Sequence, residues 1–217
     1  MNFDIAGYIG AVARVVDGYE RDGRPAHAVI ATRSYDTNPG DLWDALTNAE
    51  RIPRWFLPVS GDLRLGGRYQ FQGNAGGEIT RCEPPKLLAL TWEYAANVSW
   101  VTVTLSPEPA GGTRLDLEHV AHVEDVFWDQ FGPGAVGVGW DLALMGLALY
   151  LATGAPANPE DSAAWLASPD GKEFVRQSSD SWCLASIAAG TEAAKAEASA
   201  KRTTAFYRGE PEPMADD

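Results

Sequence analysis

Apolar and polar residues alternate along short runs between Val59 and His122, and turn residues separate these runs. A period of two places the larger side chains on one face of a strand. The alternation is clearest at Leu88, Leu90 and Trp92. Runs joined by Gly, Asn or Pro-Pro steps are typical of antiparallel hairpins. The pattern therefore predicts an antiparallel meander with strands at 68–72, 78–82, 87–94, 98–105 and 113–122.

The N-terminal part adds a strand, a hairpin and two short helices. Residues 28–35 form the first clear strand, and an Asp22-Gly23 step in the lead-in of residues 1–27 indicates a hairpin. Apolar residues at helical spacing predict a helix over 39–47, with a proline in its first turn. Asn48 can cap a second brief helix, which the next proline limits.

A long apolar segment, residues 135–153, follows the meander. A curved sheet of six or seven strands with one apolar face needs a cover, so this segment is expected to be an amphipathic helix. Its length would suit a membrane span, but Asp141 would cost ~2.5–3.5 kcal/mol on insertion, and no Lys or Arg flanks the segment. We interpret Asp141 as a capping carboxylate near the first turn, stabilised by the helix dipole. A carboxylate that faces a cavity is the alternative.

The rest of the chain is richer in Ala, Ser and charge, and predicts a helical extension. Helices are expected at 160–167, 169–189 and 191–207, with an apolar stripe that would dock on the main body or on a partner. The chain thus divides into a lead-in of residues 1–27, a main domain of residues 28–153, an extension of residues 154–209 and a frayed end at 210–217.

Charge and cysteine content exclude several classes of function. The chain carries 17 Lys and Arg against 30 Asp and Glu, a net charge of −13, with no basic run for phosphates. Nucleic acid and a membrane surface are therefore not expected partners. Cys82 and Cys183 lie too far apart in sequence for a disulfide framework or a zinc site, so we expect a cytoplasmic protein with no metal and no cofactor. The eight Trp residues indicate an aromatic-lined cavity or core.

Several blocks of the sequence resemble a known superfamily. They are residues 43–47 (WDALT), 54–56 (RWF), 61–69 (GDLRLGGRY), 77–79 (GEI), 84–88 (PPKLL), 91–92 (TW) and 113–119 (TRLDLEH). These blocks are similar to those of START/Bet v 1-like SRPBCC proteins, in the branch named after the activator of the heat-shock-protein-90 ATPase. The resemblance covers residues 28–153, and the extension is similar to one in some bacterial members. It implies an α+β helix-grip fold, in which a curved antiparallel sheet wraps on a long C-terminal helix.

The superfamily implies a deep, largely apolar cavity between the sheet and the long helix. Small residues on that helix, such as Gly137 and Gly146, would widen the gap. Ligand pockets are mostly apolar with a few placed polar groups. We therefore expect non-covalent binding of a small hydrophobic or aromatic molecule. The expected lining residues are Trp55, Phe56, Tyr69, Phe71, Trp92, Trp100, His119, Trp128, Trp140 and Leu144.

Two other functions stay open. In an enzyme of the polyketide cyclase, aromatase or dehydratase type, His119 or Glu78 would be the catalytic acid or base. The favoured interpretations are a core histidine held by hydrogen bonds and a Glu78 paired in solvent. A metal site at His122, with Glu118 and Asp125 nearby, would need a bulge or a turn to share an ion with His119, because His119 and His122 are three residues apart and face opposite sides of a strand. The chain could also be a co-chaperone-like or other interaction module that binds a second copy or another protein through its C-terminal helices.

Overall fold

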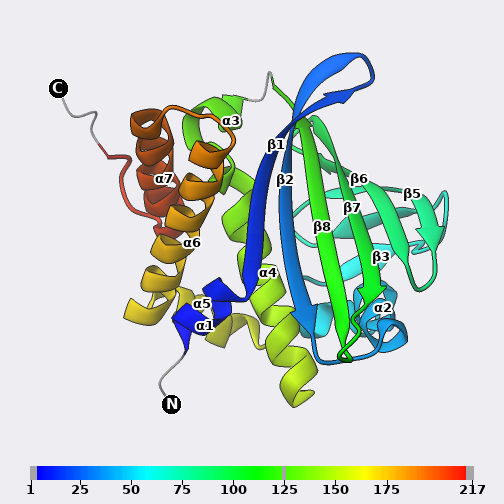
Figure 1. The fold of residues 1–217 in the computed structure, drawn as a ribbon. Helices are drawn as coiled ribbons and strands as arrows, with labels where there is room; N and C mark the ends of the chain where they lie inside the picture. Colours follow the sequence, from blue (N-terminus) through cyan, green and yellow to red (C-terminus); the bar gives the residue numbers. More distant parts are fainter. Residues whose placement is uncertain (1–3, 124–125, 214–217) are drawn as a thin grey trace. The chain divides into compact units, whose positions relative to one another are not determined.

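The structure is a computed structural model that describes residues 4–123 and 126–213. It is an α+β fold with eight strands, one more than the largest number expected, in a single sheet (Figure 1). The strand order is β1-β2-β8-β7-β6-β5-β4-β3. The strands are β1 (Val12–Arg21), β2 (Arg24–Tyr35), β3 (Val59–Gly61), β4 (Arg68–Phe71), β5 (Gly76–Glu83), β6 (Leu87–Tyr94), β7 (Asn97–Pro107) and β8 (Thr113–His122).

Helices occupy most of the remaining described chain. They are α1 (Ile5–Gly10), α2 (Pro39–Thr47), the 3-10 helix η1 (Ile52–Arg54), α3 (Val126–Phe131), α4 (Gly134–Thr153), α5 (Pro159–Ala167), α6 (Pro169–Ala188) and α7 (Ala193–Arg208). The sequence does not predict α1 or α3. Helix α1 forms because the Asp4 carboxylate accepts a hydrogen bond from the backbone N–H of Gly7 at 2.9 Å, which caps a short apolar run.

The hairpins lie where the turn residues predict them. Strands β6 and β7 pair from Leu87 opposite Thr104 to Tyr94 opposite Asn97. Between β1 and β2, Asp22 and Gly23 have φ of 54° and 73°, the left-handed conformation that a two-residue hairpin turn requires. The predicted lead-in hairpin is confirmed.

The register assigns side chains to two faces of the sheet. Residues directly opposite each other in a ladder lie on the same face. Leu90, Val101 and His119 are paired across β6, β7 and β8 and define what we call the inner face. Thr91 is paired with Trp100 on the opposite side, which we call the outer face.

The chain forms two compact units. The sheet unit contains Thr32–Ala121 and Ala143–Ala157, and the helical unit contains Met1–Ala31, His122–Leu142 and Asn158–Asp217. Strand β2 and helix α4 each continue from one unit into the other. The predicted division at 27/28 and 153/154 stays a prediction. Of the predicted frayed end, residues 214–217 lie outside the described residues, while Glu210 accepts a hydrogen bond from Lys172 and Glu212 accepts one from Gln130.

The core of the sheet unit lies on the inner face of β7 and β8. Leu115 and Leu117 on β8 are 1% and 4% exposed. The second half of α4 belongs to this core, because the Tyr35 hydroxyl donates to the Leu144 carbonyl oxygen at 3.1 Å. A Cβ on Gly146 would lie 2.7 Å from the Trp55 carbonyl oxygen, so only glycine permits α4 to approach the chain so closely after η1.

Helix α4 is apolar on all sides, not amphipathic as the sequence suggested. Its buried residues surround the helix axis; they include Val138, Asp141, Ala143, Leu144, Met145, Leu147 and Tyr150. A helix that is hydrophobic all round belongs in a core. Within the described residues, α4 is the one helix long and apolar enough to cross a membrane. Its place in both units makes it the core helix of an α+β fold, while the cytoplasmic location stays a prediction.

Asp141 forms a buried ion pair within the helical unit. Its Oδ2 accepts hydrogen bonds from Arg14 Nε at 3.0 Å and from Trp182 Nε1 at 3.1 Å, and also from the Ser178 hydroxyl. The Arg14 and Asp141 side chains are 6% and 1% exposed. Burial raises the pKa of Asp141, and the Arg14 guanidinium acts in the opposite direction. The capping interpretation is therefore wrong, because the carboxylate lies past the first turn and points at side chains of β1 and α6.

Gly137 permits close packing between α4 and α6. A Cβ on Gly137 would overlap the indole of Trp182, which is fully buried. We expect Gly137→Ala to lower the free energy of unfolding by ~1–3 kcal/mol, because overpacking displaces the ring or the backbone. A gain in helix propensity of ~1 kcal/mol offsets part of this cost. Gly10→Ala is the matched control, because a Cβ there meets open space. Urea denaturation measures both variants, and equal midpoints would show that Trp182 repacks without cost.

Candidate functional site

A row of aromatic rings crosses the sheet unit. Trp55 and Phe56 follow η1, Phe71 ends β4, and Trp92 lies on β6. The ring centroids are 5.5 Å apart for Trp55 and Phe56, 5.0 Å for Phe56 and Phe71, and 5.8 Å for Phe71 and Trp92. His119 on β8 ends the row, 6.1 Å from Trp92. Such distances are those of attractive aromatic pairs. We call these five residues the ring row.

The ring row lies where the inner face is incompletely covered. The inner-face residues Val101 on β7 and His119 on β8 are buried, at 3% and 5% exposure. On β6 the corresponding residues Leu88, Leu90 and Trp92 are only half-buried. The other rings are half-buried too; they are Trp55, Phe56 and Phe71. The inner face therefore keeps accessible apolar area along β6 and the ring row.

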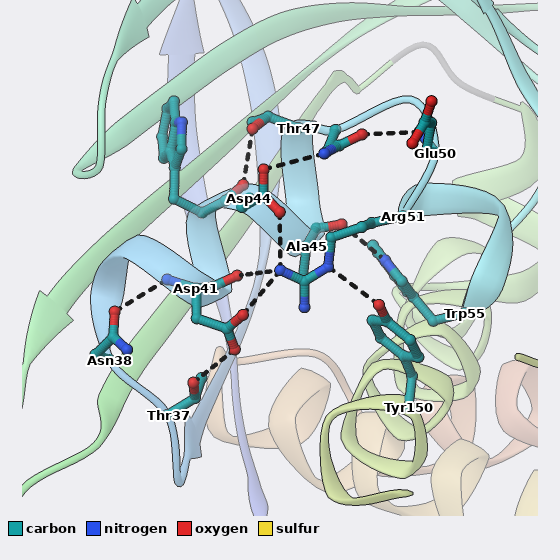
Figure 2. A network of polar contacts seen from close by, with 12 residues as sticks. Thr37, Asn38, Asp41, Asp44, Ala45, Thr47, Glu50, Arg51, Trp55 and Tyr150 are labelled. Atoms are coloured by element: carbon teal, nitrogen blue, oxygen red, sulfur yellow. Dashed lines mark hydrogen bonds and ion pairs between the residues drawn. The ribbon is translucent and has the colours of Figure 1, made fainter. Parts of the chain in front are cut away.

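A polar network around Arg51 holds the Trp55 end of the row in place (Figure 2). Arg51 Nη1 donates to Asp41 Oδ1 at 2.8 Å and to Asp44 Oδ2 at 2.9 Å, which ties η1 to α2. Arg51 Nε donates to the Tyr150 hydroxyl at 3.1 Å, which ties η1 to α4. Hydrogen bonds from Thr37 and Arg51 hold the pKa of Asp41 below its usual value. The Trp55 indole N–H donates to the Ala45 carbonyl oxygen at 2.9 Å, as Figure 2 shows, so one ring edge is fixed by backbone.

Two polar residues of the inner face, His119 and Tyr69, are neutral near pH 7. His119 Nε2 lies 2.8 Å from the Ser99 hydroxyl oxygen, and burial lowers the pKa of His119 to about 4. The one hydroxyl hydrogen of Ser99 is donated to the Trp92 carbonyl oxygen at 3.1 Å, so Nε2–H of His119 is the donor to Ser99. Burial also raises the pKa of Tyr69, whose hydroxyl donates to the Thr91 carbonyl oxygen at 2.7 Å. These groups can form hydrogen bonds with a ligand. The His119 imidazole is neutral near pH 7, so it could accept a proton from a bound molecule.

Two predicted site residues lie on the outer face. Glu78 is opposite Arg68, is exposed, and donates its backbone N–H to Thr91 Oγ1 at 2.8 Å. Trp100 is opposite Thr91. The sheet therefore separates Glu78 from His119, and Glu78 does not face the inner surface on which His119 would act as the acid or base. The physical reason is the strand period: Glu78 alternates with Ile79, which is paired with inner-face residue Leu90.

Four other predicted lining residues are not members of the ring row. Trp128 and Trp140 belong to the helical unit. Trp128 stacks on His27 with ring centroids 4.2 Å apart and an interplanar angle of 8°. Leu144 is 3% exposed in the core of the sheet unit. Tyr69 lies beside Phe71 with ring centroids 5.2 Å apart. A ligand-binding role for the ring row and its neighbours stays a prediction.

Ser99, Leu88 and Leu90 also belong to this surface, although they are not among the expected lining residues. A signal for Ser99 was available, because the two-residue turn at Ala95 and Ala96 places Ser99 opposite Trp92. Across residues 4–123 and 126–213, no group of three or more His, Cys, Asp or Glu side chains could hold a metal ion. Asp125, one of the three residues of the metal alternative, lies outside the described residues.

An eight-stranded antiparallel sheet with a long apolar helix and an aromatic inner face defines the helix-grip class of START/Bet v 1-like proteins. The family model of Activator of Hsp90 ATPase homolog 1-like protein matches residues 36–152, more than half of the chain. The chain therefore belongs to this family. The predicted superfamily, branch and fold class are confirmed.

Solved structures extend the likeness beyond the family range. The solution structure of CalU16 from Micromonospora echinospora matches with a TM-score of 0.67 and 33% identity, over 83% of this chain and 97% of CalU16. DynU16, a protein in the dynemicin biosynthetic locus, matches with a TM-score of 0.52 and 24% identity, over 59% of this chain and 48% of DynU16. PFC0360w, an HSP90 activator from Plasmodium falciparum, matches with a TM-score of 0.50 and 23% identity, over 59% of this chain and 97% of PFC0360w. The last two likenesses show the fold alone. A search of the curated proteins gave no match.

Proposed function

We propose that the sheet unit binds a small hydrophobic or aromatic molecule, without covalent chemistry, against the ring row. The observation that carries this proposal is the half-buried state of Leu88, Leu90 and Trp92, on a face where Leu115, Leu117 and His119 of β8 are buried. Exposed apolar area in a folded domain costs free energy, and a flat apolar ligand would cover it. Neutral groups at the His119 end would orient such a ligand without requiring a charge on it.

The rigid end of the ring row supports the same conclusion. The Trp55 indole is bonded to backbone, and the Arg51 network connects α2, η1 and α4 around it. Aromatic side chains held in this way lose little further conformational entropy when a ligand stacks on them. A preorganised aromatic wall is therefore better suited to binding than rings on a mobile loop.

Two tryptophans on neighbouring strands provide a test with a matched control. Trp92 lies on the inner face, and Trp100 lies on the outer face. We expect Trp92→Leu to weaken binding of the apolar probe 1-anilinonaphthalene-8-sulfonate about tenfold or more. A tenfold loss corresponds to about 1.4 kcal/mol, which is roughly the free energy lost when a bound ligand no longer stacks on the indole ring. Trp100→Leu should leave the affinity within about twofold. Fluorescence titration measures both, with circular dichroism as the check of folding.

Equal affinity of the wild type and a folded Trp92→Leu variant would contradict the proposal. Loss of affinity in Trp100→Leu alone would contradict it too, because the ligand would then lie on the outer face. Native mass spectrometry of the purified protein adds an independent measurement, because a co-purified ligand should be lost in Trp92→Leu and kept in Trp100→Leu.

The pair of His119 and Ser99 favours a second candidate function, a cyclase, aromatase or dehydratase of the polyketide type. One neutral imidazole at the end of an aromatic surface can take a proton from a carbon acid bound on the rings. DynU16, a fold relative, is a protein in the dynemicin biosynthetic locus. In this case the His119→Gln variant would bind an aromatic polyketide as tightly as the wild type does, but would no longer convert it. Retained turnover in that variant would exclude His119 as the base.

A further inference from the structure

The β6–β7 hairpin ends in an exposed tyrosine that belongs to the inner face of the sheet unit. Trp92 is paired with Ser99 on that face. The next pair of the ladder with the same orientation joins Tyr94 and Asn97, because side chains alternate along a strand. Tyr94 is 57% exposed and Asn97 is also exposed, whereas Trp92 is half-buried. Tyr94 therefore continues the apolar surface of β6 into solvent, roughly 7 Å beyond Trp92.

The ladder between β6 and β7 becomes more open toward this hairpin. The inner-face residues of β7, in order from the far end to the hairpin, are Val103, Val101, Ser99 and Asn97. The first two are 8% and 3% exposed, the third is half-buried and the fourth is exposed. A molecule that lies along β6 therefore meets solvent at Tyr94 and Asn97, while its other end lies beside buried side chains of β7.

The turn that closes the hairpin has an unfavourable backbone conformation. Ala95 and Ala96 have φ of 49° and 68°, the left-handed region that favours glycine or asparagine. In alanine the Cβ crowds the following carbonyl oxygen, so a longer loop without positive φ would be a less strained connection. Strained residues of this kind are concentrated at ligand-binding sites. The tight turn keeps Tyr94 and Asn97 as a directly opposed pair at the edge of the inner face.

This pair brings polar groups to the open end of an apolar surface. Tyr94 presents a phenol hydroxyl and Asn97 a carboxamide, and both groups donate and accept hydrogen bonds. Ligand pockets are mostly apolar, with a few polar groups that fix the orientation of the ligand. A tyrosine is suited to the boundary between an apolar ligand and water, because its ring is apolar and its tip is polar.

We propose that Tyr94 and Asn97 form the mouth of the ligand surface and make hydrogen bonds to a polar end group of the ligand. The apolar body of the ligand lies on Trp92 and Leu90, and a neutral hydroxyl, carbonyl or amide group at its end faces solvent. The distance from Trp92 to Tyr94 requires a flat body at least about as long as two fused rings. This inference rests on the proposed function, and adds to it a specificity-determining residue and a direction along β6.

Two compounds that differ by one hydroxyl, naphthalene and 2-naphthol, test the mouth by competition with 1-anilinonaphthalene-8-sulfonate on the full chain. Tyr94→Phe keeps the ring and removes the hydroxyl. It should lower the affinity for 2-naphthol about fivefold, the effect of one neutral hydrogen bond, and leave the affinity for naphthalene within about twofold. Asn97→Ala should act in the same direction. Tyr19→Phe is the matched control, because Tyr19 is 43% exposed on β1 in the helical unit and should change neither affinity.

The outcomes separate this inference from the proposed function. If Trp92→Leu weakens both compounds but neither Tyr94→Phe nor Asn97→Ala changes the ratio of their affinities, the proposed function stands and the mouth is overturned. An equal loss of both compounds in Tyr94→Phe would also overturn it, because the hydroxyl would then stabilise the hairpin instead of contacting the ligand. If Trp92→Leu weakens neither compound, the proposed function fails and this inference fails with it. Tyr94 and Asn97 are exposed, so we expect both variants to fold, which circular dichroism checks.

Discussion

Replacing Asp141 by Asn should lower the free energy of unfolding by ~3–5 kcal/mol, the largest effect expected for any single polar substitution in this chain. The Arg14 guanidinium is 6% exposed and donates to Asp141 Oδ2 at 3.0 Å. Without the carboxylate, a permanent positive charge stays buried beside Trp182, and its desolvation is no longer compensated. Urea denaturation at pH 7, followed by circular dichroism, measures the loss.

A double variant separates the charge effect from simple loss of packing. Removing both charges with Arg14→Met and Asp141→Leu should restore most of the lost stability, because no unpaired buried charge remains. Arg64→Met serves as the surface control. Its Nε lies 2.6 Å from Asp62 Oδ2, but the side chains are 80% and 50% exposed, so we expect a loss of at most about 1 kcal/mol. If Asp141→Asn changed stability no more than Arg64→Met, the buried pair would not hold the helical unit together.

The Asp141 contacts also show where sequence reasoning stops. The partners Arg14, Ser178 and Trp182 lie 127, 37 and 41 residues away along the chain. Helical periodicity and capping preferences act over a few residues, so they assign Asp141 to the local dipole of its own helix. The apolar surroundings of Asp141 were visible in the sequence, but the arginine that neutralises it comes from a strand of the lead-in segment. A long-range ion pair of this kind needs the fold before it can be seen.

The strands show the opposite case. Alternation and flanking turn residues define residues 87–94 and 113–122 to the correct end residues, because hairpin register depends on local turn geometry. The same geometry separates Trp92 from Trp100, since a two-residue turn makes Trp100 the partner of Thr91. The error of grouping these tryptophans came from treating aromatic content as a sign of proximity. The strand period together with the two-residue turn assigns them to opposite faces.

Acidification should destabilise the protein through His119. Its pKa is lowered to about 4 by burial, while an unfolded histidine titrates near 6.5. Between these values the unfolded chain binds a proton that the folded chain does not, so the free energy of unfolding falls as the pH is lowered from about 6.5 to about 4. Above about 6.5 this contribution to stability is fully present. The loss over the whole window should be about 3 kcal/mol.

The variant His119→Gln should flatten this part of the pH profile, because glutamine does not titrate. Carboxylates also bind protons in acid, but they are the same in both proteins, so the difference between the two profiles reports on His119. Ser99→Ala is the matched control. It removes the hydrogen bond at 2.8 Å but keeps a buried histidine, so stability should fall at every pH while the slope between about 4 and 6.5 is retained. Urea denaturation at several pH values measures the slopes, and NMR titration of the wild-type imidazole gives the pKa directly. A wild-type His119 that titrates near 6.5 would show that water reaches the ring row at its β8 end, and the pH dependence would then have another origin.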